Sequence, residues 1–129
     1  MTRLTAPQVA HALRAHPHGV TPSILSADLR ATPSATRTHL TRLAEQGGCV
    51  REGATYRPLT DHEIRAQLLA RLTRYPQLEY WPGGLARKLP HLHLTADEVH
   101  AHLRALAAAG HVTWTSDRGQ PWQWYGVAL

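Results

Sequence analysis

Apolar residues recur every three or four positions in two stretches, one near the start of each half of the chain. This spacing places them on one face of an α-helix. The two apolar faces consist of Val9 and Leu13 in the first half, and of Ile64, Leu68, Leu72 and Tyr75 in the second. Each half is therefore expected to open with a helix that packs against a core.

Threonine residues indicate where the helices begin, because a Thr hydroxyl can accept a hydrogen bond from an otherwise unpaired backbone N–H. The N-cap positions are Thr5, Thr60 and Thr95 in T-x-x-[E/Q] capping boxes, and Thr21 and Thr32 before a Pro at the first helical position. A sixth helix is expected near Trp81-Pro82.

A third helix is predicted in each half, at about 33–46 and 96–109, and each ends where Gly47 or Gly110 can adopt a left-handed conformation. A β-like stretch follows each of them. The stretches are CVREGATYRP, with a turn near Glu52-Gly53, and VTWTSDRGQPWQWYGV, with a turn near Asp117-Arg118-Gly119. Each half is thus predicted to contain a long helix, a short helix, a second long helix and a β-hairpin.

The two halves also match each other residue by residue. The matched pairs include Leu13 and Leu72, Pro17 and Pro76, Leu25 and Leu85, Leu29 and Leu89, Thr32 and Thr95, His39 and His102, Leu40 and Leu103, Leu43 and Leu106, and Gly47 and Gly110. The drift in offset indicates about three additional residues within 90–93 of the second half. We interpret the pattern as an internal duplication, with a first module at 1–59 and a second at 60–129.

The order of these elements resembles the winged helix-turn-helix family. The residues that carry the resemblance are TPSILSADLRATPSATRTHLTRLAEQGGCVREGATYRP and LTADEVHAHLRALAAAGHVTWTSDRGQPWQWYGV. The third helix and the strand after it look like the recognition helix and wing of bacterial winged-helix regulators. The resemblance implies a mainly α fold with small β-hairpin wings in two modules. It further implies that the third helix enters the major groove of DNA while the wing reaches phosphates or a neighbouring groove.

Composition and charge favour a polyanionic partner over a membrane. The chain of 129 residues carries 14 basic and 9 acidic side chains, a net charge of +5 with neutral His. No apolar run approaches the ~20 residues of a membrane-spanning helix, and no signal peptide is recognisable. A lone cysteine, Cys49, fits a reducing compartment, so we expect a cytoplasmic protein.

The first module carries the candidate DNA-binding residues. Arg pairs with guanine edges, and hydroxyls and Arg bind phosphates. The candidates are Ser34, Arg37, Thr38, Thr41 and Arg42 on the outward face of the third helix, and Arg51 and Arg57 in the wing. An ordinary solvated helix face is the alternative. Transcription regulation is the wider role that the resemblance suggests.

The second module carries acidic residues on the helix that corresponds to the basic third helix of the first module. Its third helix opens with Asp97 and Glu98, which DNA phosphates would repel, although a Glu can also accept from cytosine N4. Residues 1–60 carry seven basic and three acidic side chains, whereas residues 61–129 carry seven and six. The second module is therefore assigned to a protein partner, a dimer interface or a sensing role.

The second hairpin is rich in aromatic residues. Trp122 and Trp124 are expected on one strand face with Trp114 across from them, and Tyr125 follows. These residues either close the core of a chain that lacks Phe or form an exposed surface for a protein or for single-stranded nucleic acid. We expect a homodimer through this hairpin. The alternative functions are a protein-interaction scaffold, as in chromosome-segregation complexes, and single-strand binding.

Neither metal binding nor catalysis is predicted. His91 and His93 lie close in sequence, as do His100 and His102. Residues i and i+2 on a helix point apart, so His100 and His102 do not both reach one ion, and no CxxC or HExxH motif is present. No Walker loop or nucleophile elbow occurs. We expect no cofactor, no metal and no enzymatic activity.

Overall fold

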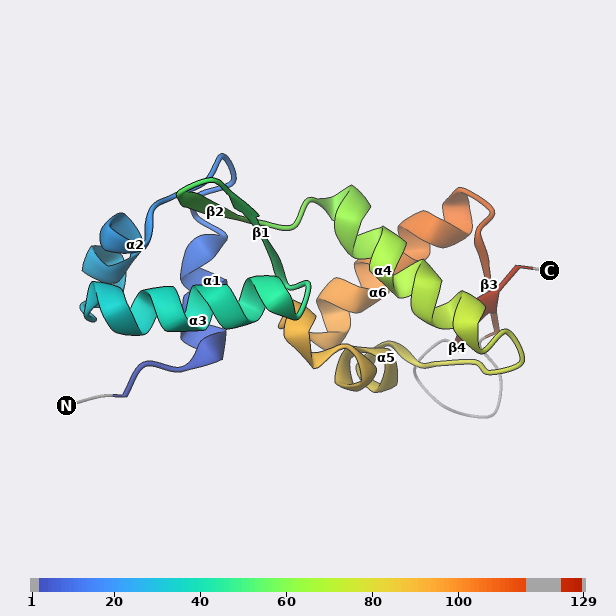
Figure 1. Cartoon of the computed structure of the whole chain (residues 1–129). Helices are drawn as coiled ribbons and strands as arrows, with labels where there is room; N and C mark the ends of the chain where they lie inside the picture. The colour runs from blue at the N-terminus through green and yellow to red at the C-terminus, as the bar shows by residue number, and fades with distance from the viewer. Residues whose placement is uncertain (1–2, 116–123, 129) are drawn as a thin grey trace. The chain divides into compact units, whose positions relative to one another are not determined.

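Among the described residues, each half of the chain contains three α-helices followed by a β-hairpin. The computed structural model describes residues 3–115 and 124–128 and divides into two units, Met1–Thr60 (unit 1) and Asp61–Leu129 (unit 2). The described residues are mainly helical, with two small antiparallel hairpins (Figure 1). This confirms the mainly α class with small hairpins and is compatible with a winged-helix-like fold.

Unit 1 contains the first three helices and the first hairpin. The elements are α1 (Ala6–Leu13), α2 (Pro22–Leu29), α3 (Pro33–Glu45), β1 (Cys49–Glu52) and β2 (Thr55–Pro58). Each helix begins where the sequence predicts, because the side chains of Thr5, Thr21 and Thr32 accept from the backbone N–H three residues on. The predicted capping box of Thr5 and Gln8 is complete in both directions.

The core of unit 1 lies between its three helices and its hairpin, and α3 packs against both α1 and α2 (Figure 1). The buried residues are Val9, Leu13, Val20, Leu25, Leu40, Leu43, Cys49 and Tyr56. Val20 adds a third backbone segment to the hairpin, because its N–H and C=O both form hydrogen bonds of 2.9 Å with the backbone of Tyr56. On α3 the buried residues are Thr36, Leu40 and Leu43, on the side of the helix opposite to the residues predicted to face outward.

Unit 2 repeats this order with one additional turn. Its elements are α4 (Asp61–Arg74), α5 (Pro82–Lys88), η1 (Pro90–Leu92), α6 (Ala96–Ala108), β3 (Val112–Thr115) and β4 (Trp124–Val127). The 3-10 turn η1 occupies the segment where the sequence comparison places additional residues. Tyr80 pairs with Tyr125 through two backbone hydrogen bonds of 2.8 Å, as Val20 does with Tyr56 in unit 1.

The start of α5 is built around Trp81, which has no side-chain cap hydrogen bond. Its ring lies directly on the backbone of Gly83 and Gly84. A Cβ at Gly83 would be 2.3 Å from ring atom Cζ3, and one at Gly84 would be 2.8 Å from Nε1. The two glycines therefore allow the indole to cover the first turn of the helix, and Arg87 lies over the ring at 5.6 Å.

Candidate nucleic-acid interface

One face of α3 presents exposed polar and basic side chains. Ser34, Arg37, Thr38 and Arg42 are exposed, and Thr41 is half-buried. Residues three and four apart are neighbours on a helix surface, so the side chains form one continuous strip. The predicted residues of α3 are thus brought together, on the side of the helix opposite its buried stripe.

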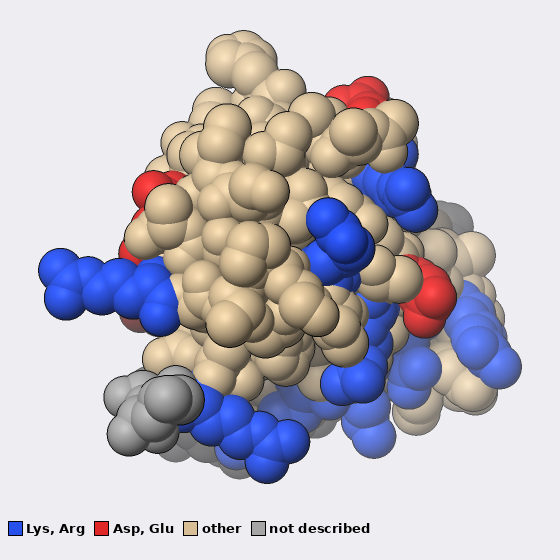
Figure 2. All heavy atoms as spheres, turned by 60° about the vertical axis from the view of Figure 1, so that its left-hand side comes forward, with Lys and Arg blue, Asp and Glu red and all other residues tan. Residues whose placement is uncertain are grey.

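The N-terminal end of α3 is favourable to an anion. Its first turn contains no acidic residue, and the Thr32 hydroxyl caps it by accepting from the Ala35 N–H at 3.1 Å. The helix dipole adds partial positive charge at this end. Figure 2 shows basic side chains standing out from the surface, whereas acidic ones form small, separate patches.

Arg30 is a residue that the sequence analysis missed. It is exposed and follows α2 in a left-handed conformation, with φ of 51°, immediately before the turn into α3. A left-handed non-glycine residue is uncommon, and it lets the chain reverse between the two helices. The only sequence signal for it was its place two residues before the N-cap Thr32.

The hydroxyls of α3 have specific partners. Thr38 Oγ1 donates to the Ser34 carbonyl at 3.0 Å, so its only hydrogen is used and, in this rotamer, it can accept but not donate to a ligand. Thr41 Oγ1 lies 3.4 Å from the hydroxyl oxygen of Tyr56. Thr41 therefore joins α3 to the hairpin.

Arg51 belongs to the same surface as α3. It pairs across the hairpin with Tyr56, and cross-strand partners share a face. Its guanidinium lies 5.8 Å from the centroid of the Tyr56 ring, and its Nε–H donates to the Gly53 carbonyl at 3.0 Å. Through Tyr56 and Thr41, this arginine is connected to the strip on α3.

Arg57 lies on the other face of the hairpin. It pairs with Val50, and side chains alternate along a strand, so Arg57 and Arg51 project from opposite faces. The Nε–H of Arg57 donates to Glu52 Oε1 at 3.1 Å, and its Nη1 donates to the Pro58 carbonyl at 3.1 Å. The structure thus separates two wing residues that the sequence analysis grouped together.

The corresponding helix of unit 2 has a different surface. Thr95 and Glu98 form a complete capping box, in which the Glu98 carboxylate accepts from the Thr95 N–H at 2.9 Å. Asp97 is exposed beside it. His100 makes an edge-to-face contact with the Tyr125 ring, with centroids 5.8 Å apart. The N-terminus of α6 therefore carries negative charge where that of α3 carries none.

The aromatic hairpin of unit 2 differs from the expectation. Trp114 pairs with Tyr125 and Thr115 pairs with Trp124, so Trp114 and Trp124 lie on opposite faces because a shift of one residue reverses the face. Trp114 is 50% exposed, whereas Tyr125 is wholly buried and belongs to the core. Trp122 and the predicted turn lie outside the described residues.

Cys49 lies in an environment that disfavours reactivity of its thiol. Burial raises the pKa of its thiol from 9.0 to about 11, and the Sγ lies 3.8 Å from the Leu40 carbonyl oxygen. Thiolate chemistry is therefore disfavoured at this position. Within residues 3–115 and 124–128, no three His, Cys, Asp or Glu side chains are grouped as metal ligands, and no helix has the length and apolar character needed to cross a bilayer.

No protein-family model matches the chain, and no curated protein matches it. Among solved structures, the chain is similar to the DIP2311 protein from Corynebacterium diphtheriae, with a TM-score of 0.41 and 11% sequence identity. The match covers 93% of this chain and 25% of that one, so this chain spans a quarter of that protein. The likeness is too low to transfer a fold or a function.

Proposed function

We propose that unit 1 binds duplex DNA, with α3 in the major groove. The observation that carries the proposal is the strip on α3, where Ser34, Arg37, Thr38 and Arg42 are exposed on one face without an acidic neighbour in the first turn. Arg37 lies in the first part of the helix, the part that helix-turn-helix proteins direct at base edges. We assign Arg37 to base contact and Ser34 and Arg42 to phosphates.

The hairpin supports this proposal through Arg51. Its side chain is on the face that connects to α3 through Tyr56 and Thr41, which is where a second contact with the same duplex would be made. The guanidinium of Arg57 is already paired with the Glu52 carboxylate, which competes with a phosphate for it. We therefore assign Arg51, and not Arg57, as the wing residue that contacts the DNA backbone.

We also propose that both units are winged-helix modules that arose by duplication. The order of elements is the same in each, and the pairing of Val20 with Tyr56 has its counterpart in that of Tyr80 with Tyr125. On this interpretation Asp97 and His100 replace Ser34 and Arg37, and the second module has lost its attraction for phosphate. Sequence-selective binding by unit 1 would serve transcription regulation.

A protein-interaction role for unit 2 is the second candidate. Trp114 is half exposed on β3, and exposed tryptophan is typical of interface anchors. We retain the homodimer as a prediction, with Trp114 in place of the buried Tyr125 as the contact. A base-stacking surface that combines Trp114 with Trp124 is not favoured, because they lie on opposite faces.

Fluorescence anisotropy with a labelled 20-base-pair duplex and with its separate single strand tests the proposal. We expect the duplex to bind more tightly, and the logarithm of the binding constant to fall linearly with the logarithm of salt concentration over ~50–200 mM. Stronger binding to the single strand, or no binding to either, would refute it. Mixed-sequence and A·T-rich duplexes should then be compared to measure base preference.

A further inference from the structure

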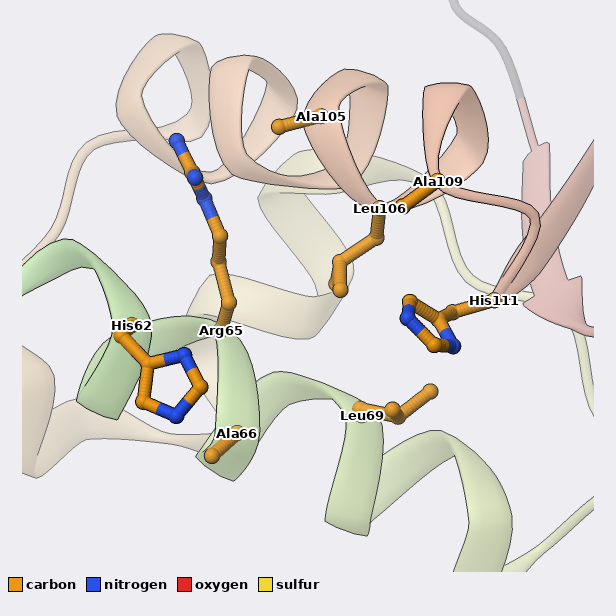
Figure 3. Close-up of a pocket in the computed structure, with 8 residues that line it drawn as sticks. All are labelled: His62, Arg65, Ala66, Leu69, Ala105, Leu106, Ala109 and His111. Carbon is orange, nitrogen blue, oxygen red and sulfur yellow. The ribbon is translucent and has the colours of Figure 1, made fainter.

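A hollow lies between α4 and α6 in unit 2. Its volume is about 290 Å³, at the lower end of the range for small-molecule sites. Figure 3 shows Leu106 extending from α6 toward α4, and Leu69 extending from α4 toward His111. Ala66, Ala105 and Ala109 complete an apolar lining.

The polar groups of the hollow are nitrogen-bearing. Arg65 and His62 lie toward one end and His111 toward the other (Figure 3), and no carboxylate is among the lining residues. Asp61 and Glu98 are close enough to affect the pKa of His102, but neither lines the hollow. A permanently charged guanidinium beside an apolar surface is suited to an acid with an apolar body.

Arg65 is held in place by a second residue. Its Nε–H donates to Nδ1 of His102 at 3.2 Å, and burial lowers the pKa of His102, so the imidazole remains a neutral acceptor. This bond fixes the guanidinium plane while the two terminal amino groups keep donor capacity for a carboxylate. Because His102 is neutral, this hydrogen bond does not offset the positive charge of Arg65.

We propose that this hollow binds small monocyclic carboxylates, with the ring between Leu69 and Leu106 and the carboxylate on Arg65. At about 290 Å³ the hollow is small for a ligand site, which favours a ligand with one ring and a carboxyl group. Such a site in unit 2 is independent of DNA binding by unit 1, and its test contains no DNA.

The test uses the whole chain and NMR titration of the Leu and Ala methyl groups. The probes are benzoate, phenylacetate and cyclohexanecarboxylate, with benzamide as the uncharged counterpart of benzoate. We expect saturable shifts that are largest at Leu69 and Leu106 for at least one of the acids. Benzamide should bind about tenfold more weakly than benzoate, since a hydrogen bond to a charged group is lost.

Two variants and their controls make the test specific. Arg65→Gln should weaken benzoate binding about tenfold and leave benzamide unchanged, whereas Arg74→Gln on the same helix should alter neither. Ala66→Leu should fill the hollow and abolish binding of both, and Ala70→Leu, at an exposed position of α4 that does not line the hollow, should not. Absence of saturation with all three acids, or binding that survives Ala66→Leu, would overturn the proposal.

Discussion

The Nε–H of Arg57 donates to the Glu52 carboxylate at 3.1 Å, on the face of the β1–β2 hairpin opposite to Arg51. The pair is diagonal across the strands, with the Arg57 side chain mostly covered and that of Glu52 more than half exposed. One of two neighbouring arginines is therefore neutralised by its own hairpin. The other, Arg51, lies over Tyr56.

Glu52→Gln should strengthen binding of the duplex. The substitution removes a carboxylate that repels phosphate and leaves the Arg57 charge uncompensated, so the duplex should bind more tightly at low salt. Stability should change by less than about 1 kcal/mol, because exposed ion pairs contribute little. The control is Glu45→Gln on α3, which changes net charge equally. Equal effects of the two substitutions would assign the gain to net charge alone.

Gly83→Ala should destabilise unit 2. An added Cβ would be 2.3 Å from Cζ3 of the Trp81 ring, so the indole must shift off the helix. We expect a loss of about 1–3 kcal/mol from overpacking, whereas Gly→Ala within a helix otherwise gains about 1 kcal/mol. Chemical denaturation measures the difference. In a Trp81→Ala background the same substitution should be neutral or stabilising, and a loss there would contradict the proposed clash.

Thr36→Val should stabilise unit 1. Thr36 is wholly buried, and within the described part of the chain its Oγ1 has no hydrogen-bond partner. Valine has the same shape without the hydroxyl, so the free energy of unfolding should rise by about 1 kcal/mol. Thr38→Val, at an exposed position of the same helix, is the control and should bring no gain. A loss of stability in Thr36→Val would mean that the hydroxyl is paired.

Unit 2 should lose stability on acidification. Burial lowers the pKa of His102 and of His91 below 6.5, so the unfolded chain takes up protons at a higher pH than the folded one. The stabilisation is complete above pH 6.5 and is lost as the pH falls toward the folded-state values. Protonation also removes the Nδ1 acceptor of Arg65. His102→Gln should make the slope of unfolding free energy between pH 5 and 6.5 shallower, and an unchanged slope would exclude His102.

The helices could be predicted from the sequence because their starts are local signals. Thr5, Thr32 and Thr95 each accept from the N–H three residues on, and no distant contact is needed for that bond. The buried stripe of α3 follows equally from its 3.6-residue period. Gly47 and Gly110 both have φ of 83°, as their position after the predicted helices requires.

The faces of the hairpins could not be predicted, because they depend on register. The sequence shows a turn near Gly53 but does not show which residue pairs with Arg51. Because Arg51 pairs with Tyr56 and not with Arg57, the two arginines lie on opposite faces of the hairpin. For the same reason, the sequence led to the wrong expectation that Trp114 lies across from Trp124. The hollow beside Arg65 was also invisible, because it depends on how α4 and α6 pack in three dimensions.

The central claim is that α3 of unit 1, and not the charge of the whole chain, binds duplex DNA. The most direct test compares the duplex affinity of Arg37→Ala with that of Arg104→Ala, an exposed arginine on α6 whose loss changes net charge equally. Binding is measured by anisotropy at ~100 mM salt with several duplex sequences. We expect Arg37→Ala to cost about 1–3 kcal/mol and to relax base preference, and Arg104→Ala to have little effect. Equal losses in the two variants, or no loss in Arg37→Ala, would contradict the account.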